Sequence, residues 1–448
     1  MRVDVETQHP RGNIVNGRKH RGLVWFVVPW LVGVGGCAKQ QVRPEPPPAA
    51  AQAPEPQAPK APEAPKAPEA PVAELPSPLP LLYSPSKGLS AAVSHLFFTR
   101  YERELYVSSA WWLSQYRFPS GEHIGGTNHK GEVSSLVFDR YGQYVATTAF
   151  GAPGDRTGRV ISLSSGNVFA ALEHPRRVSH IALHPDDKHV VTACIDRKIR
   201  LWDRFDSTVV QEHTMPEAIG SMALSPDGEL LAVSNDFDAK ESRMRLLEVR
   251  SGQERLSLRP RGKGALVRFS PDGEWIAAVS GSWVELWAVD GRPHFEFQHP
   301  DEVSHFSFSP DGKYLVTTSE AAHGECQSPE CAFAVVRKVA TGTEVARLRH
   351  EGVVQQVVFS KDGRYLATSN GTTAAHIWEV ERETEVARLE APTTALAFSA
   401  DGKLFAMGTH GVAFAVWSLE PALSPSTPKP WRLQLPPPTN TPPDAPAP

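Results

Sequence analysis

The chain is poor in cysteine and carries no excess of positive charge. Only 4 of its 448 residues are cysteine, which excludes a small fold held together by a disulfide framework. The formal net charge is −4, so the sequence lacks the basic surplus that binds a nucleic-acid backbone. We therefore expect no nucleic-acid partner.

Familiar catalytic motifs are also missing. The sequence contains no GxSxG, HExxH or GxxxxGK[ST] pattern. Five aspartates recur at equivalent places, but repetition along the chain predicts separate turns for them, not one convergent site: Asp227, Asp272, Asp311, Asp362 and Asp401. We expect a protein that is not an enzyme, with no catalytic residue, no cofactor and no metal ligand.

The apolar run near the start of the chain is too short to cross a bilayer. It extends from Leu23 to Val34, whereas a spanning helix needs about 20 residues. Basic residues precede it and Gly35-Gly36-Cys37 follows it, which is typical of a signal peptide. Small residues before a lone cysteine resemble the lipobox of bacterial lipoproteins. That resemblance implies removal of residues 1–36 and lipidation (palmitate or a similar acyl chain) at Cys37.

Two other interpretations of this segment stay open, a plain secretory signal and an uncleaved anchor. Ala38 follows the cysteine where aspartate often directs retention in the inner membrane. The expected location is therefore the cell envelope, on the outer membrane, facing either the periplasm or the cell surface.

Proline dominates both flanks of the central region. The 37 residues from Pro44 to Pro80 contain 14 of the 41 prolines, and they include the near-repeat APKAPEAPKAPEAP. Proline removes backbone donors, so this composition disfavours helix and sheet and favours an extended spacer. We expect a disordered linker over residues 37–80 and a disordered tail over residues 436–448.

A repeat of about 40 residues fills the region between. Its marker is the tetrapeptide SPDG or a relative of it, and the eight copies start at Thr99, Asp139, His184, Ser225, Ser270, Ser309, Ser360 and Ser399. Short apolar or alternating runs flank each marker, and Pro-Asp-Gly favours a tight turn between them. Four short strands per repeat predict the blade of a β-propeller.

The repeats resemble the WD-repeat β-propeller family over about residues 81–420. The best copy runs from His174 to Asp203. The resemblance implies a buried hydrogen-bonding tetrad formed by His174, Thr192, Asp196 and Trp202. Histidines recur at the equivalent place in His129, His299 and His350, and tryptophans in Trp287, Trp378 and Trp417. Thr372 and Gly411 replace the aspartate, so the tetrad is degenerate elsewhere.

We therefore predict an all-β fold, a single propeller over residues 81–435 with eight four-stranded blades; seven is the alternative, because the first repeat is weak. Two segments could close the ring by adding the outer strand of the last blade. Leu81–Ser84 is favoured over Trp431–Leu435, because prolines crowd the stretch before Trp431.

The cysteines of the propeller region fall into two kinds. Cys326 and Cys331 lie in the longest repeat, and in an exported chain they predict a local disulfide more readily than a zinc site, which would lack two ligands. Cys194 lies in a predicted strand and fits a small buried hydrophobe.

Loop lengths suggest a binding face. The long repeats carry their extra residues between the second and third strands, in 151–158, 236–241 and 321–331. These loops are expected on one face of the ring, which favours that face for binding.

We expect a monomeric, membrane-anchored interaction or scaffolding module with protein partners. Two alternatives remain. One is an exported propeller enzyme such as a quinone-dependent dehydrogenase, which a bound chromophore would reveal. The other is an outer-membrane assembly subunit, which co-purification with membrane barrels would reveal.

Overall fold

The computed structural model contains β-strands and almost no helix. It describes residues 93–99, 104–109, 112–117, 120–128, 132–139, 141–150, 155–236, 239, 241–262, 264–319, 333–350, 352–409 and 413–419, together with the strands at 81–83 and 431–433. Residues 1–36, the linker with Cys37, His129, the Cys326–Cys331 pair, Gly411 and the tail lie outside this part. In the described part, no helix is long and apolar enough to cross a membrane.

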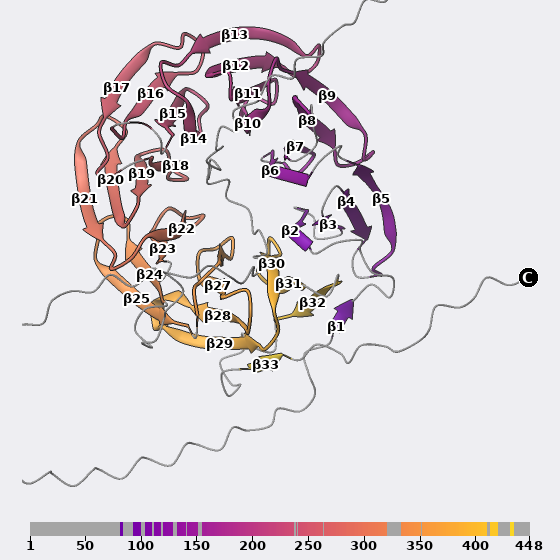
Figure 1. Ribbon diagram of the computed structural model, residues 1–448. Coiled ribbons are helices and arrows are strands. Elements are labelled where there is room, and N and C mark those ends of the chain that lie inside the picture. Colours follow the sequence, from indigo (N-terminus) through magenta and orange to yellow (C-terminus); the bar gives the residue numbers. More distant parts are fainter. Residues whose placement is uncertain are drawn as a thin grey trace, which may run out of the picture.

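Eight sheets stand around a central axis, and the chain passes through them in order (Figure 1). Blades 1 to 4 comprise β2 (Val93–Phe98), β3 (Glu104–Ser109), β4 (Trp112–Arg117) and β5 (His123–Asn128); β6 (Glu132–Phe138), β7 (Tyr144–Phe150), β8 (Thr157–Ser162) and β9 (Val168–Glu173); β10 (Val178–Leu183), β11 (His189–Cys194), β12 (Lys198–Asp203) and β13 (Thr208–Thr214); and β14 (Ile219–Leu224), β15 (Leu230–Asn235), β16 (Met244–Glu248) and β17 (Glu254–Leu258).

The second half of the ring repeats this plan. Blades 5 to 8 comprise β18 (Leu266–Phe269), β19 (Trp275–Ser280), β20 (Trp283–Ala288) and β21 (Pro293–Gln298); β22 (Val303–Phe308), β23 (Tyr314–Ser319), β24 (Phe333–Lys338) and β25 (Glu344–Arg349); β26 (Gln356–Phe359), β27 (Tyr365–Ser369), β28 (Ala375–Glu379), the 3-10 turn η2 (Val380–Arg382) and β29 (Thr384–Leu389); and β30 (Thr393–Phe398), β31 (Leu404–Thr409) and β32 (Ala413–Ser418) with β1 (Leu81–Tyr83). The prediction of eight four-stranded blades is confirmed.

In blades 3 to 8 the repeat marker forms the turn between the first and second strands. At Ser309 the backbone N–H donates to the carbonyl of Tyr314 at 2.8 Å, and the Ser309 hydroxyl donates to Asp311 Oδ1 at 2.6 Å. The same hydroxyl accepts the Tyr314 N–H at 2.9 Å. Gly312 has φ = 74°, which a residue with a Cβ rarely adopts. The five repeated aspartates are therefore turn residues, each in a different blade from blade 4 to blade 8.

Burial changes from the centre of each blade to its edge. The second strands β11, β15 and β23 are buried at every position, whereas the outer strand β13 alternates between exposed and half-buried residues. Strands in the middle of a blade are covered on both sides by the neighbouring blades. The core is thus a ring of packed interfaces between blades; for example, one cluster of buried residues contains both Val107 of blade 1 and Val416 of blade 8.

The N-terminal strand closes the ring. β1 pairs antiparallel with β32, with Leu81 opposite Trp417, and becomes the outer strand of blade 8 (Figure 1). β33 (Trp431–Leu433) instead adds a parallel fifth strand to blade 7, with Trp431 opposite Ala387. The preference for Leu81–Ser84 over Trp431–Leu435 is therefore confirmed, with the strand ending at Tyr83.

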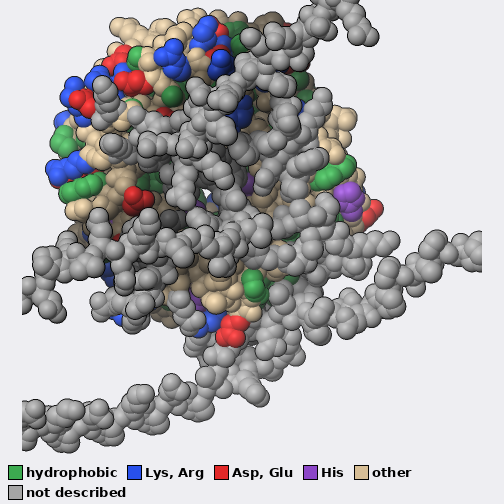
Figure 2. Space-filling model, in the orientation of Figure 1, with side chains coloured by type: hydrophobic (Ala, Val, Ile, Leu, Met, Phe, Trp, Pro, Cys, Tyr) green, Lys and Arg blue, Asp and Glu red, His purple; other side chains and the backbone are tan. Residues whose placement is uncertain are grey.

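Charged groups are mixed on the face seen in Figure 2. Along the rim over β13 and β17, basic and acidic side chains alternate, so the described part of this face presents no extended surface of one sign.

Candidate functional site: the central channel and the blade 2–3 edge

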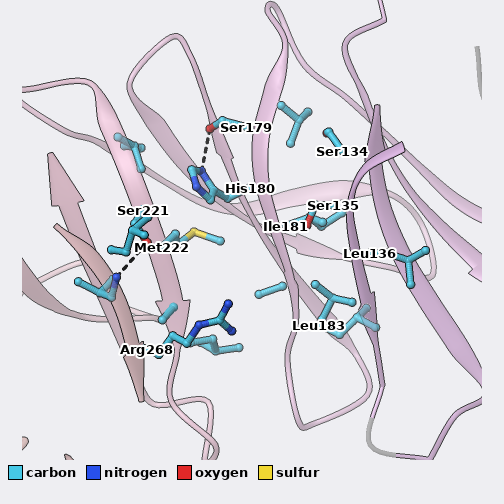
Figure 3. Close-up of a pocket in the computed structure, with 18 of the residues that line it drawn as sticks. Ser134, Ser135, Leu136, Ser179, His180, Ile181, Leu183, Ser221, Met222 and Arg268 are labelled. Atoms are coloured by element: carbon cyan, nitrogen blue, oxygen red, sulfur yellow. Dashed lines mark hydrogen bonds between the residues drawn. The ribbon is translucent and has the colours of Figure 1, made fainter. Parts of the chain in front are cut away.

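The first strands of the blades line a central channel. It encloses a cavity of about 870 Å³ whose wall comes from β2, β6, β10, β14, β18 and β22. In Figure 3, Ile181 of β10, Met222 of β14 and Arg268 of β18 all face this space. The wall combines aliphatic side chains with a few polar groups, which is the usual composition of a ligand site.

Three histidines occupy the same position of three different blades. His95, His180 and His305 each lie four residues before the repeat marker, so each points from a first strand into the channel. His95 Nδ1 lies 3.1 Å from the Ser94 hydroxyl. His180 Nδ1 lies 3.0 Å from the Ser179 hydroxyl (Figure 3).

The channel keeps these histidines neutral at physiological pH. Burial lowers the pKa of His95 to about 4. Burial, and then the charge of Arg177, lowers the pKa of His180 to about 4. Burial, and then the charge of Arg268, lowers the pKa of His305 to about 3. Neutral imidazoles can both donate and accept hydrogen bonds.

Arg268, like Arg177, is a permanent cation of the channel wall. Its side chain is open to the channel water, while protein surrounds it closely enough to lower its pKa. The guanidinium lies 5.5 Å from the centre of the Phe306 ring. Carboxylates that line the cavity are confined to strand ends and turns: Asp139, Asp187 and Asp236. The middle of the channel therefore suits an anionic or hydrogen-bonding group.

Three residues of the predicted tetrad, Trp202, Thr192 and His174, form a chain of hydrogen bonds. Trp202 Nε1 donates to Thr192 Oγ1 at 2.8 Å, and Thr192 Oγ1 lies 2.8 Å from His174 Nε2. His174 Nδ1 donates to the Leu172 carbonyl at 2.9 Å, so Nε2 accepts the proton of the Thr192 hydroxyl. Burial lowers the pKa of His174 and favours this neutral form.

Asp196, the fourth residue of the predicted tetrad, is hydrogen-bonded to Arg200. Arg200 Nη2 donates to Asp196 Oδ2 at 2.8 Å, and the Lys198 N–H donates to Oδ1 at 3.0 Å. The carboxylate therefore pins the turn between β11 and β12. Arg200 thus takes the place that the predicted tetrad gives to His174 as the partner of Asp196. The sequence pattern alone does not reveal this exchange, because it does not show that the side chains of Arg200 and Asp196 meet.

Threonine accompanies the recurring histidine. His299 Nε2 lies 2.8 Å from Thr317 Oγ1, and Trp378 Nε1 donates to Thr368 Oγ1 at 2.9 Å beneath His350. The pairs occur in blades 6 and 7, as in blade 3. Blade 8 has Met407 at the threonine position, and the buried Nε1 of Trp417 has no partner among the described residues. These groups hold blades together and do not form a reactive site.

An aromatic cluster lies at the outer edge of blades 2 and 3. The Arg204 guanidinium carbon lies 4.3 Å from the Tyr144 ring centre, 5.3 Å from Phe205 and 5.7 Å from Phe169. Tyr144 and Phe169, and Phe169 and Phe205, meet edge to face. Arg204 is only 6% exposed, and its Nε and Nη1 have no hydrogen-bond partner in the described structure. Cation–π contacts hold this charge in place of an acid.

The same edge exposes an unusual amount of apolar surface. Phe205 is 64% exposed and Val210 51%. Three further exposed apolar residues adjoin them in the outer strands β9 and β13: Val168, Phe169 and Val209. Neighbouring apolar residues that remain open to water mark a contact surface for another molecule. We call these five residues with Arg204 and Tyr144 the blade 2–3 edge.

Sequence reasoning missed the channel set and the blade 2–3 edge, although both leave a trace. The channel histidines share one offset from the repeat marker. Val168-Phe169 and Val209-Val210 interrupt the alternation of an outer strand with two apolar residues in a row.

The prediction that Cys194 is a small buried residue can be compared with the structure. Cys194 is buried and free, with its thiol 3.3 Å from the Arg176 carbonyl. Most of the three long loops lies outside the described residues, but each connects the second strand of its blade to the third.

The comparisons with known proteins agree with the architecture. The WD40 family (WD domain, G-beta repeat) matches residues 166–203 and 291–321, which include most of blade 3 and the turn of blade 6. Two stretches of the propeller are therefore similar to the WD40 repeat. The computationally designed Ika8 protein has a similar fold, with a TM-score of 0.61 and 18% identity over 74% of this chain and 98% of that structure.

The natural proteins that this chain resembles are distant in sequence. A 77 kDa echinoderm microtubule-associated protein of Lytechinus variegatus is 26% identical over 37% of this chain, which spans only 26% of that protein. A serine-threonine kinase receptor-associated protein of Gallus gallus is 22% identical over 58% of this chain and 70% of its own length. A WD repeat-containing protein of Synechocystis is 28% identical over 31% of this chain and 40% of its own length. These relatives support a protein-interaction or scaffolding module.

Proposed function

We propose that this chain is an exported, lipid-anchored scaffold that binds a protein partner through the blade 2–3 edge. The observation that carries the proposal is the exposed aromatic cluster around Arg204. Aromatic residues and arginine dominate binding energy at protein interfaces. A rigid propeller presents them without the entropy cost of ordering a loop.

The partner should present apolar side chains to this edge. Phe205 and the valines Val209 and Val210 offer a hydrophobic surface, and Arg204 adds positive charge beneath it. The central channel is a second binding place, and it suits a smaller anionic group. The lipobox-like segment before Cys37 supports placement at a membrane, with the proline-rich linker as a spacer.

The interaction is tested by removing the exposed apolar groups. Phe205→Ser together with Val210→Ser should abolish a specific cross-linked complex in membranes of the native host, because the contact area is lost. Both side chains are mostly exposed, so the melting temperature should change little. Trp112→Ser is the matched control: Trp112 is 43% exposed but lies in β4 of blade 1. Retention of the complex in the double variant, or its loss in the control, would refute the edge as the binding surface.

The anchor is tested separately. Cys37→Ser should release the protein from the membrane fraction or leave an uncut precursor, because no thioether to a lipid can form. Mass spectrometry of the N-terminal peptide checks this directly. An unacylated mature N-terminus in the native host would exclude lipidation, while leaving the binding surface unaffected.

A further inference from the structure

We propose that the first turn of blade 3 is a binding site for a single divalent metal ion of the zinc type. His184, Asp186 and His189 converge there, and one potential ligand atom from each lies within 4.8 Å of the others. Among the described residues, this is the group of three histidine, cysteine or acidic side chains whose potential ligand atoms lie close enough together to bind one metal ion.

The distances are close to those of a metal site. His189 Nδ1 lies 2.6 Å from Asp186 Oδ2, and His184 Nδ1 lies 3.0 Å from Asp186 Oδ1. Zinc bonds of about 2.0–2.2 Å place tetrahedral ligands roughly 3.3 Å apart. Small rotations of the three side chains would therefore admit an ion between them. Two imidazoles and one carboxylate suit zinc and its neighbours better than calcium or magnesium.

Hydrogen bonds already orient the ligands. His184 Nε2 donates to the Gly228 carbonyl of blade 4 at 3.0 Å, which leaves the lone pair on Nδ1. The Asp186 N–H approaches that lone pair at 3.2 Å, a weak bond that an ion would replace. A metal-bound histidine commonly donates its other N–H to a backbone carbonyl in this way.

Asp186 is held by its other oxygen. Asp186 Oδ1 accepts the N–H groups of Lys188 and His189 at 2.9 and 3.0 Å, so Oδ2 is the oxygen available to a metal. An ion that binds His189 at Nδ1 requires the neutral ring to carry its proton on Nε2 instead, so the hydrogen bond to Asp186 Oδ2 is exchanged for the metal bond.

The surroundings favour a cation and allow it to enter. The side chains of His184 and His189 are 5% and 11% exposed, whereas that of Asp186 is 28% exposed and gives access from solvent. Two more carboxylates lie close enough to interact with the histidines, Asp227 with His184 and Asp203 with His189, although Lys188 Nζ pairs with Asp203 Oδ2 at 3.2 Å. The Arg250 guanidinium lies 3.9 Å from Asp186 Oδ2, but its side chain is 68% exposed and free to move away.

Other blades show that these two histidines are not needed for the turn. Blade 6 forms it with Ser309 and Tyr314 at the positions of His184 and His189, and blade 7 with Ser360 and Tyr365. The turn geometry explains the aspartate, which every SPDG-like copy has, but it does not explain the pair of histidines.

This equivalence supplies the test. Zn²⁺ is titrated calorimetrically into the full-length chain, and Co²⁺ absorption reports tetrahedral coordination. The wild type should bind one ion per chain at this site. His184→Ser with His189→Tyr copies blade 6 and should weaken binding by more than about 100-fold, because two of three ligands are lost. In a chelator, its melting temperature should stay near that of the wild type.

Two further variants keep the outcome decisive. Asp186→Asn keeps the turn-forming Oδ1 and should also weaken binding, which covers the case in which the double variant folds poorly. His123→Asn removes an exposed histidine of β5 and should change nothing. Absence of wild-type binding at micromolar Zn²⁺, or undiminished binding in the double variant and in Asp186→Asn, would overturn the proposal.

Discussion

Deleting residues 81–83 should lower the melting temperature by roughly 6–12 °C, because blade 8 then loses its outer strand, which comes from the chain segment before blade 1. The loss of β1 leaves the edge of β32 unpaired and uncovers the outer part of blade 8. We expect a cost of about 3 kcal/mol, at about 2–4 °C per kcal/mol for a large domain. The unpaired edge should also promote aggregation, which light scattering detects.

Two controls separate ring closure from shortening of the chain. Deletion of residues 61–63 removes the same length from the linker and should have no effect on melting. Truncation after residue 420 removes β33, which only adds to an already complete blade 7, and should cost much less than loss of β1. If the truncation proves the more damaging change, the C-terminal strand stabilises the ring instead.

Mild acid should destabilise the propeller well before its carboxylates titrate. Burial, and then nearby charges, lowers the pKa of His299 to about 4 and that of His350 to about 3, and it also lowers the pKa of His174. In the unfolded chain these histidines take up a proton near pH 6.5, so the unfolded state binds more protons below that pH. Stability is therefore complete above pH 6.5 and falls as the pH drops toward 4.

The expected loss is about 2 kcal/mol for each of His299 and His350 between pH 7.5 and pH 5. Denaturant unfolding at a series of pH values measures it. His350→Phe should reduce the slope by one proton, since both ring nitrogens of His350 lack hydrogen-bond partners in the described structure. The ionisable groups that act on His350 are His376, Glu385 and Arg388, and they are unchanged in this variant. An unaltered slope would show that His350 is not one of the groups responsible.

The carboxylates belong to a different pH window. The pKa values of Asp186 and Asp196 are lowered by hydrogen bonds and neighbouring cations that outweigh burial. Their stabilising effect is present above their unfolded pKa of about 4 and is lost only below it. Destabilisation between pH 5 and 6.5 therefore reports the histidines.

Local chemistry made the architecture predictable. In blades 3 to 8 the repeat markers form the same turn, because the aspartate and glycine that most of these copies carry favour it regardless of the neighbouring blades. Ring closure by β1 was predictable from chain length and from the prolines before Trp431.

Contacts between blades were not predictable in the same way. Arg204 of blade 3 contacts Tyr144 and Phe169 of blade 2 because of the angle at which the two blades pack. The spacing of residues along the sequence does not determine this angle. Asp196 bonds Arg200 because strand register brings them together. The meeting of His184 and His189 depends on the turn geometry, in which residues five apart face each other.

The pairing of β1 with β32 has a kinetic consequence. More than 300 residues separate the two strands in the chain, so the first strand to be synthesised waits for nearly the last. Such distant contacts slow folding strongly, whereas the entropy of closing a loop rises only with the logarithm of its length. The ring should therefore close late but hold firmly once closed. Until then the blades form an open array with unpaired, aggregation-prone strand edges at both ends, which a chaperone would have to shield.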